Sequence, residues 1–395
     1  MLTGFTTQYQ RDVIRGVLRF CQMHGNLICG FVEVENAQQG AVQPPHMLQV
    51  TGIIGAIFPG VFQQIKSLNL PMVNVSNRDP VPGVPRVGVQ DDVIGNLAAE
   101  HFIERGFRNF AMAEIKGHAY SIARAVGYRK RLEQEGHSVH FAPLPKREQR
   151  PRRHAWSRDP DEDDMADWLV ELPKPVGVFT ANDLRGYRII SLCQQLGLRV
   201  PEQVAVLGVD NDDIYVCGAN PPLSSIDVPG MDIGHQAAAL LLRMLNGETP
   251  PAEPILLPPG RVMTRQSTDI VAVSDPDLCT ALAWLRENAH RPINIDDLVE
   301  HMALSRTWIE KRFRDLLGRS PARELLRVRV AMARTLLLDT QMSLNAIALR
   351  AGFGSTHRLI ATFRREVGKT PGDFRKHHRL RTVSNRLTAG QSAHS

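Results

Sequence analysis

The sequence predicts an α/β region followed by an all-α region with two helix-turn-helix units. Three observations predict this architecture. Strand-like and helix-like segments alternate up to about residue 268, the strand pattern then stops, and the basic surplus lies in the C-terminal part. From Pro276 onward there are 21 basic and 11 acidic residues, whereas the whole chain carries only +6. A basic module joined to a mildly acidic body is typical of proteins that bind a polyanion.

Length and composition exclude several classes of protein. At 395 residues the chain is long enough for two or three domains, and 43% hydrophobic with 22% charged residues indicates a globular protein. No apolar run approaches the roughly 20 residues that a membrane-spanning helix needs. The N-terminus lacks a secretory signal pattern, and the five cysteines form no CxxC pair. We therefore expect a cytoplasmic protein with reduced thiols, no membrane contact and no metal site.

Short apolar runs mark the strands of the first region, residues 1–268. These runs are Leu27–Val32, Ile53–Phe58, Met72–Ser76, Phe110–Ala113, Val176–Thr180 and Val204–Val209. Helix-period segments lie between them, among them Val93–Arg105, Gly127–Gln134 and Leu184–Leu196. Strands that alternate with helices form a parallel sheet covered on both faces.

One segment interrupts the alternation. Residues 146–164 read KREQRPRRHAWSRDPDEDD, basic in the first half and acidic in the second. The segment is either a nucleic-acid patch or carboxylate site, or a solvated loop whose two halves neutralise each other. We favour the loop, because no apolar periodicity fixes these side chains in place.

The second region contains one design twice. Residues 269–275 are the expected linker, residues 276–380 the helical domain and residues 381–395 a polar tail. In each copy a serine begins a helix that turns two apolar residues inward, four positions apart. These residues are Ser305 with Ile309 and Phe313, and Ser355 with Leu359 and Phe363. The outer faces carry Arg306, Thr307, Glu310, Lys311 and Arg314 in the first copy, and Thr356, His357, Ala361, Arg364 and Arg365 in the second.

Helices of this kind enter the major groove of double-stranded DNA. Residues near the helix start reach base edges, and arginines further along meet phosphates. The long helical segment Pro321–Leu338 would hold the two copies at a fixed spacing, and about 34 Å is one turn of duplex. The alternative is that these charges only solvate a helical bundle. The basic surplus, the doubled unit and the polar faces together favour DNA.

The second copy resembles the DNA-binding domain of AraC-type transcription regulators. The family pattern I-A-x-x-x-G-F-x-S…F-x-x-x-x-G-x-T-P-x-x-F/Y-R matches Ile347, Ala348, Gly352, Phe353, Ser355, Phe363, Gly368, Thr370, Pro371, Phe374 and Arg375. Leu359 departs from the pattern, since the family usually has an aromatic residue at this core site. Ala361 lies where some members carry a base-reading arginine, so the resemblance implies a different site preference there, such as contact with a thymine methyl group.

The first region resembles the effector domain of LacI-type regulators and the periplasmic sugar-binding proteins. The runs TANDLRG (Thr180–Gly186), LRVPEQVAVLGVDNDD (Leu198–Asp213) and PPLSSIDVP (Pro221–Pro229) carry the resemblance. It implies two α/β lobes that enclose a small ligand at the C-terminal ends of their strands. Such a cleft distinguishes sugars because a sugar with the wrong arrangement of hydroxyl groups leaves some polar groups of the cleft without hydrogen-bond partners.

The same resemblance implies the effector-binding residues. Arg124, expected just ahead of a helix, together with Asn182 and Asp210 at strand ends, would hydrogen-bond ligand hydroxyls. Without the resemblance, Arg124 would be interpreted as a surface charge. For Asp210, a turn residue and a ligand-binding residue would be equally good interpretations. The pocket would also contain Tyr9 and Tyr120, as sugar-stacking or core tyrosines, and Gln90, where many members have an aspartate.

The order of the two regions indicates the function. LacI-type repressors carry their DNA reader at the N-terminus, whereas here an AraC-type reader follows the effector region. The combination implies a sequence-specific regulator, an activator, of a sugar-catabolic operon. Its effector would be a monosaccharide such as xylose, or another small carbohydrate or polyol, and its partners RNA polymerase and a second copy of the chain. A transport-type binding protein would leave the basic helices unexplained. No GxGxxG, GxxxxGK[ST], GxSxG or HExxH motif indicates an enzyme, and no cofactor is expected.

Overall fold

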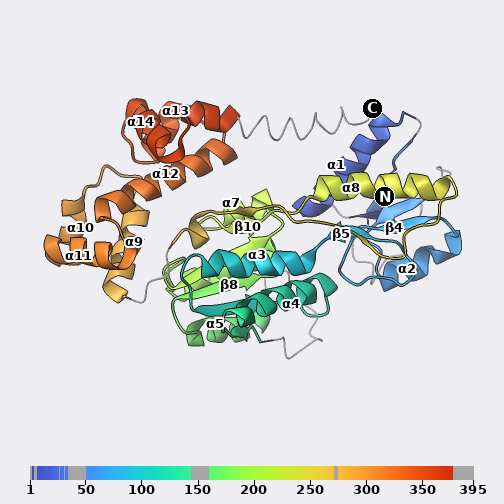
Figure 1. Ribbon diagram of the computed structural model, residues 1–395, viewed down its shortest axis with the longest axis horizontal. Coiled ribbons are helices and arrows are strands. Elements are labelled where there is room, and N and C mark those ends of the chain that lie inside the picture. The colour runs from blue at the N-terminus through green and yellow to red at the C-terminus, as the bar shows by residue number, and fades with distance from the viewer. Residues whose placement is uncertain are drawn as a thin grey trace. The chain divides into compact units, whose positions relative to one another are not determined.

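The computed structural model describes residues 2–3, 7–25, 27–30, 32–33, 50–143, 160–270 and 275–376. The chain forms two compact units, Met1–Ala272 and Val273–Ser395, and each is described by itself. The first unit contains every strand that the structure describes, and the second is helical (Figure 1). Across the described ranges, no helix is long and apolar enough to cross a membrane, and no cluster of side chains is suited to hold a metal ion.

The first lobe of the α/β unit is built on a four-stranded parallel sheet of order β2-β1-β3-β4. The strands are β1 (Leu2–Thr3), β2 (Val32–Glu33), β3 (Ile53–Gly55) and β4 (Met72–Asn74). Helices α1 (Gln8–Met23) and α8 (Gly230–Leu245) lie side by side on one face (Figure 1). Ile53 and Met72 pack on the other face against α2 (Pro59–Ile65), which is followed by η1 (Lys66–Leu68).

The second lobe is built on a six-stranded sheet of order β12-β10-β9-β8-β6-β7, in which only β12 runs antiparallel to its neighbour. Its strands are β6 (Asn109–Ala113), β7 (Val139–Phe141), β8 (Val176–Thr180), β9 (Val204–Val209), β10 (Ser224–Ile226) and β12 (Val262–Met263). Its helices are α3 (Asp91–Ile103), α4 (Ala119–Gln134), α5 (Pro160–Glu171), α6 (Asp183–Gln195) and α7 (Asp213–Gly218), with the short η2 (Gln266–Thr268).

Alternating side chains along β8 show how the second sheet is covered. Val176 and Val178 belong to the apolar cluster with α5 and α6. On the opposite face Phe179 contacts the Tyr128 ring of α4, with 5.1 Å between ring centroids. Because successive side chains of a strand point to opposite faces, this strand is buried on both sides along its whole length.

The chain crosses between the two lobes three times. It crosses first at β5 (Val87–Val89), between β4 and α3, and again between β10 and α8. The third crossing is β11 (Ile255–Leu257), which pairs with β5 in parallel as a separate two-stranded sheet. These three crossings connect the two lobes.

Three sequence expectations about this unit need correction. The strand expected at Leu27–Val32 is wrong, because residues 27–30 form no strand and β2 begins at Val32. The helix expected at Gly127–Gln134 begins at Ala119, so Arg124 lies within a helix and not ahead of it. Its first turns bury small or polar residues such as Ser121 and Arg124, and these give no apolar periodicity. The segment 146–164 was expected to be a loop throughout, but the chain is helical from Pro160. The rest of that segment lies outside the described residues.

Buried hydroxyl groups fasten the end of the first unit to its second lobe. Ser267 accepts a hydrogen bond from the Ser224 amide at 2.8 Å and donates to the Val206 carbonyl at 2.6 Å. Thr268 Oγ1 lies 2.7 Å from Ser224 Oγ and 2.8 Å from His101 Nε2. Burial lowers the pKa of His101 well below its usual value, with Arg105 adding to the effect, so the ring is neutral. The segment leading to the second unit therefore starts from a fixed point on this lobe.

The second unit comprises two helix-turn-helix pairs joined by a long helix. Its helices are α9 (Pro276–Asn288), α10 (Ile295–Met302), α11 (Arg306–Leu317), α12 (Pro321–Asp339), α13 (Leu344–Arg350) and α14 (Thr356–Val367). Asp275 caps α9, as expected, by accepting from the Leu278 amide at 2.8 Å. Arg329 of α12 donates to the Ala289 carbonyl at 2.9 Å. At Gly352, where φ is +74°, a Cβ atom would lie 1.9 Å from the same carbonyl, so this family glycine is required by packing.

Candidate functional site

A close crossing of α3 and α4 places the first charged pair of the site. A Cβ added at Gly95 would lie 2.1 Å from the Arg124 carbonyl, and one at Gly127 would lie 2.0 Å from the Asp92 carbonyl. Only glycine allows the two helices to touch backbone to backbone. The crossing brings Asp91, at the start of α3, to Arg124 on α4.

Arg124 is buried and makes three interactions. Its Nε donates to Asp91 Oδ1 at 2.9 Å, and its Nη1 donates to the Ala181 carbonyl at 2.5 Å. Its guanidinium also lies over the Tyr120 ring, 4.9 Å from the centroid. Burial opposes the charged form, but Asp91 and Asp210 outweigh it, so the pKa of Arg124 is raised. This arginine is not a surface charge, which was the alternative interpretation of its sequence position.

Tyr120, one turn before Arg124 on α4, and Asn182, at the start of α6, lie beside this arginine. Asn182 is the N-cap of α6, where its side-chain oxygen accepts from the Arg185 amide at 2.9 Å. The Tyr120 hydroxyl lies 3.0 Å from His118 Nδ1. Burial raises the pKa of Tyr120 to about 12, although Arg124 and Asn182 work in the opposite direction. Because the cap occupies its oxygen, Asn182 can offer a ligand chiefly its amide N–H groups.

Asp210 follows β9 in a left-handed backbone conformation, with φ of +102°. The buried Asp183 holds the following turn, accepting from the Asp212 amide at 2.7 Å and from Ser225 Oγ at 2.6 Å. Burial raises the pKa of Asp210 to about 7, although Arg124 works in the opposite direction. Asp210 is therefore both a turn residue and a carboxyl group that lies within the field of Arg124.

Tyr9 reaches the same group of side chains from the first lobe. Its hydroxyl donates to the Val75 carbonyl at 2.6 Å. Burial, followed by the charges of Asp91 and Asp210, raises the pKa of Tyr9. Polar side chains from both lobes thus form one group, which we call the interlobe cluster. Its members are Tyr9, Arg86, Asp91, Tyr120, Arg124, Asn182 and Asp210.

Sequence reasoning missed Asp91 and Arg86 as members of this cluster. Gln90 precedes α3 as its N-cap residue, without a side-chain cap, whereas Asp91 supplies the carboxylate that pairs with Arg124. Asp91 Oδ2 also accepts from Asn77 of the first lobe at 2.5 Å. The adjacent Asp91 was visible in the sequence, but the family position pointed to Gln90. Nothing in the sequence signalled Arg86.

Asp212 links the two lobes next to the interlobe cluster. Its carboxylate caps its own helix α7 by accepting from the Ile214 amide at 3.2 Å. It also accepts from the amide of Gln8, the first residue of α1 in the other lobe, at 2.7 Å. Arg11 of α1 lies 3.4 Å from Asp212 and from Asp213. A carboxylate at a helix N-terminus is favourable, so this contact stabilises the arrangement of lobes seen here.

The first reading helix, α11, is capped and packed as expected. Ser305 accepts from the Trp308 amide at 3.2 Å, and Ile309 and Phe313 are buried. Arg306, Thr307, Lys311 and Arg314 are exposed, and Glu310 is half-buried. Arg306 is held within the module, because it pairs with Asp296 at 2.8 Å and with Glu310 at 3.1 Å.

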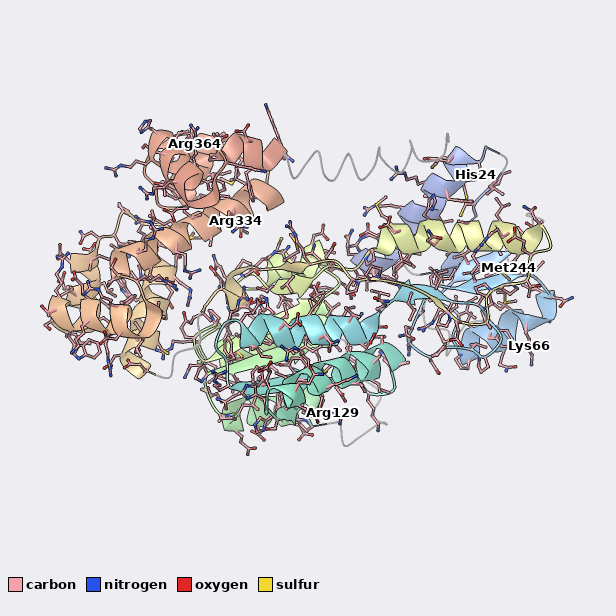
Figure 2. All side chains as sticks on the ribbon, in the orientation of Figure 1. His24, Lys66, Arg129, Met244, Arg334 and Arg364 are labelled. Carbon is pink, nitrogen blue, oxygen red and sulfur yellow. The ribbon has the colours of Figure 1, made fainter. Side chains whose placement is uncertain are left out.

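The second reading helix, α14, has the same construction. Ser355 accepts from the Arg358 amide at 3.3 Å, and Leu359 and Phe363 are fully buried. The exposed residues of the predicted face are His357, Ala361, Arg364 and Arg365. Figure 2 shows Arg364 on this helix. Thr356 is half-buried, with its hydroxyl 3.3 Å from Asn345 Oδ1.

Two arginines of the reading helices were not singled out from the sequence. Arg358 is exposed and lies three residues before Ala361 and seven before Arg365, so it shares their face. Helical spacing alone would have found it. Arg312 pairs with Asp275 at 2.8 Å and lies over the Trp308 ring, so it braces α11 against the start of α9.

Known families and relatives match both units. The family model of the periplasmic binding protein-like domain matches residues 99–268, and that of a helix-turn-helix domain matches residues 298–377. The xylose operon regulatory protein of Escherichia coli (strain K12) is 29% identical over 323 residues, which cover 79% of this chain and 80% of that protein. The xylose operon regulatory protein of Haemophilus influenzae is 26% identical over 375 residues, or 93% and 95% of the two chains.

A solved structure agrees with these relatives. The structure of the xylose-binding transcription activator xylR matches with a TM-score of 0.75 and 25% identity, over 95% of this chain and 97% of that chain. This chain is a homologue of the xylose operon regulatory proteins. The regulator combines a periplasmic-binding-protein-like unit with a helical helix-turn-helix unit, as the sequence predicted. Its relatives are regulatory proteins of a xylose operon and not enzymes, and the chain is a transcription regulator with the same two units.

Proposed function

We propose that the regulator binds a monosaccharide such as xylose at the interlobe cluster and that this binding controls its hold on operator DNA. The observation that carries the proposal is the convergence of side chains from both lobes on Arg124 and Asp210, next to the crossing strands. Arginine, amide and carboxyl groups are the partners that paired sugar hydroxyls need. The names of the relatives and of the matched structure refer to xylose, which supports this sugar over another small carbohydrate or polyol.

The effector residues divide into two roles in this proposal. Arg124, Asp210 and Asn182 would hydrogen-bond the hydroxyls, with Asp91 keeping Arg124 in place. Tyr120 and Tyr9 would border the sugar. Each also has a structural contact, because the Arg124 guanidinium lies over the Tyr120 ring and the Tyr9 hydroxyl donates to the Val75 carbonyl. Gln90 would lie at the edge of the site, one residue before Asp91.

Effector binding would stabilise the closed arrangement of lobes. Asp210 and Asp212 lie in one turn, so a sugar held by Asp210 would favour the Asp212 contact with Gln8 and Arg11 of the opposite lobe. The anchored Ser267–Thr268 segment would pass the change to the chain that leads to the DNA-binding unit. Such coupling is reciprocal, so operator DNA should raise or lower sugar affinity by the same factor.

The exposed faces of α11 and α14 would read two successive segments of major groove. Residues near the helix starts, Thr307, Lys311, Thr356 and His357, would reach base edges, together with Ala361. Arg314, Arg364 and Arg365 would meet phosphates. Arg306 and Glu310 would support the first helix through their mutual ion pair. We further propose a cytoplasmic homodimer that activates by contacting RNA polymerase, because one module alone covers too little DNA for a specific operator.

The test is a thermal-shift panel of pentoses, hexoses and polyols on the full chain, followed by DNA titrations with and without any ligand found. A ligand that binds only the folded state raises the melting temperature in a concentration-dependent way. We expect a shift with xylose, absent in Asp210→Ala, and a change in affinity for a duplex selected by the full chain from random sequences. The proposal is overturned if no sugar or polyol shifts the melting temperature, or if a bound sugar leaves DNA affinity unchanged.

A further inference from the structure

One nitrogen of the interlobe cluster is buried without a partner. Arg86 Nη1 is shielded from solvent and has no hydrogen-bond acceptor among the residues that the structure describes. The neighbouring members of the cluster differ in this respect. Arg124 donates to Asp91 and to Ala181, and Tyr9 donates to Val75. Because an unsatisfied buried donor of a charged group costs more than about 1–3 kcal/mol, this nitrogen is a candidate for contact with a bound molecule.

The backbone of Arg86 is fixed at the point where the chain leaves the first lobe. Arg86 forms a β-bridge with Asn74, at the end of β4, and its carbonyl accepts from the Ile255 amide of β11 at 2.9 Å. Val75, the residue after Asn74, accepts the Tyr9 hydroxyl. The arginine therefore starts from the strands that join the lobes, beside the carbonyl that holds Tyr9.

The charges around Arg86 indicate where its side chain lies. Burial lowers the pKa of Arg86, and the neighbouring Asp91 and Tyr9 oppose this effect. Asp91 is already bonded to Arg124 and to Asn77. The Arg86 guanidinium thus shares the electrostatic surroundings of the cluster while its Nη1 remains unsatisfied. A guanidinium has only donors, so the missing partner must be an acceptor oxygen.

The charge balance of the cluster favours an uncharged molecule. Arg86 lies near Asp91, and Arg124 lies near Asp91 and Asp210, whose raised pKa of about 7 leaves it partly protonated at neutral pH. An added carboxylate would interact with the acids as well as with the arginines, whereas a hydroxyl group can accept from an arginine and donate to an aspartate. A molecule with several hydroxyl groups can satisfy Arg86 and Asp210 together.

We propose that Arg86 is a specificity-determining residue of the effector site, whose Nη1 donates to one oxygen of an uncharged monosaccharide. This assignment rests on the proposed function, since it adds a recognition group to the same site. It predicts that one particular hydroxyl or ring oxygen of the sugar is recognised from the strands between the lobes, and not from the strand ends that carry Asn182 and Asp210.

The experiment compares Arg86→Met with the wild-type full chain by isothermal titration of the sugar found in the panel and of its monodeoxy derivatives. Methionine keeps much of the side-chain length but removes every donor. We expect the parent sugar to bind Arg86→Met about 10- to 100-fold more weakly, the range for a lost hydrogen bond to a charged group. The wild type should bind the parent sugar more tightly than each deoxy derivative. For one derivative the two affinities should become about equal in Arg86→Met, while the ratios for the other derivatives should stay as in the wild type.

Arg15→Met is the matched control, because Arg15 is exposed on α1 and pairs only with the nearby Asp12 among the contacts described. It should bind the parent sugar and every derivative as the wild type does. A role of Arg86 in folding alone would weaken all sugars equally and would leave each preference intact, which would overturn the assignment. Parent-sugar binding within twofold of wild type would overturn it too, as would tighter wild-type binding of the corresponding sugar acid.

Two further outcomes are distinguishable. If Arg86→Met does not fold, Arg86→Lys takes its place. Lysine keeps the charge but loses the planar fork. The affinity for the parent sugar should therefore fall, and the preference over the same deoxy derivative should shrink, whereas an unchanged affinity would overturn the assignment. If the wild type binds no sugar at all, the proposed function fails and this assignment fails with it. Sugar binding by the wild type with unchanged preferences in the variants would overturn the assignment alone.

Discussion

The interlobe cluster and the reading helices both consist of polar and charged residues, but they are built differently. In the cluster, Arg124 and Asp91 are 5% and 4% exposed, and the bonds between them connect two helices. On the reading helices, Arg306 and Arg365 have side chains that are 56% and 63% exposed, with partners on their own or a neighbouring helix. Removal of a buried charge leaves its partner unpaired in a medium of low polarity, whereas an exposed charge is replaced by water.

This difference assigns different tasks to the two regions. The buried pairs hold their geometry before a ligand arrives, so the proposed effector site would discriminate by leaving groups unsatisfied. The exposed cations act at longer range, and salt screens them, which is suitable for binding DNA phosphates. Substitutions in the two regions should therefore differ in the size of the effect and in the property that changes.

The largest effect is expected for Arg124→Ala. It leaves Asp91 buried without its cationic partner and removes the bond to the Ala181 carbonyl, so the first unit should lose about 3–5 kcal/mol of stability together with sugar binding. Chemical denaturation and thermal shift of the full chain measure both losses. The control is Arg129→Ala on the same helix, where the side chain is exposed (Figure 2) and pairs loosely with Glu133 at 3.8 Å. Equal losses for the two variants would contradict the contrast between buried and exposed charge.

A buried charge in the DNA-binding unit should behave like the cluster. Glu324 of α12 is 1% exposed and bonds Arg319 at 2.5 Å and Arg327 at 2.7 Å. Burial alone would raise its pKa, but these arginines lower the pKa to about 2. The lowered pKa stabilises the fold above the ordinary value of 4.5, and this stabilisation is lost as the pH falls from 4.5 toward 2. The loss should be roughly 2–4 kcal/mol.

Denaturation of the full chain between pH 5 and pH 2, followed by a probe in the second unit such as Trp284 fluorescence, would measure this loss. Glu324→Gln should be less stable at neutral pH and should show a flatter dependence on pH. Asp296→Asn serves as the control, because the Asp296 side chain is 76% exposed and should change stability by less than about 0.5 kcal/mol. A wild-type unit whose stability is the same at pH 5 and pH 2.5 would refute the role of Glu324.

A smaller effect is expected from the ionisation of Asp210. Burial raises its pKa to about 7, so ionising this group costs stability as the pH rises from its usual value of 3.8 toward 7. If sugar hydroxyls donate to the carboxylate, a proton competes with the sugar below about pH 7. Sugar affinity should then fall up to about tenfold per pH unit, or 1.4 kcal/mol, and level off above pH 7.

Calorimetric titrations from pH 5.5 to pH 8.5 would measure this dependence. Asp210→Asn should bind more weakly and lose the dependence, whereas Asp213→Asn, at an exposed position of the next helix, should retain it. The charged and titratable neighbours of position 210 are Asp91, Tyr9, Arg124 and Tyr120. They are the same in the wild type and in both variants, so any difference in pH dependence comes from the substituted residue. A dependence that persists in Asp210→Asn would assign it to another group.

The smallest effect is expected on the reading helices. Lys311→Ala and His357→Ala each remove one exposed contact, so affinity for the selected duplex should fall by about 1 kcal/mol, or fivefold. Melting temperature and sugar affinity should not change. Loss of sugar binding with unchanged DNA affinity would reverse the assignment of the two regions.

The sequence was most informative where local chemistry decides the structure. Caps and turns depend on a few neighbouring residues, so Asp275, Ser305 and Ser355 were predicted as N-caps and are N-caps. The strands Val176–Thr180 and Val204–Val209 have the predicted bounds, because apolar runs of that length suit a strand buried on both faces. The inward positions of α11 and α14 follow in the same way from helical periodicity.

The proposed effector site was less predictable because its residues come from distant segments. The family resemblance supplied Arg124, Asn182 and Asp210, but it favoured Gln90 over Asp91 and gave no indication of Arg86. The helix containing Arg124 was placed too late, since a buried face of small and polar residues lacks the usual signal. Arg306 carries the charge expected of a DNA contact, yet its partners Asp296 and Glu310 are known only from the fold.

By itself, the sequence determined the two-part architecture and the starts and faces of the two reading helices, because these depend on short-range backbone chemistry and on the spacing of apolar residues. Only the tertiary structure decided which charges are partners. The glycine crossing of α3 and α4 places Asp91 beside Arg124. The contact between Gln8, at the start of α1, and Asp212 joins residues more than 200 positions apart in the chain. Pairing of this kind depends on desolvation and on distances in space, and no local pattern of residues encodes either of them.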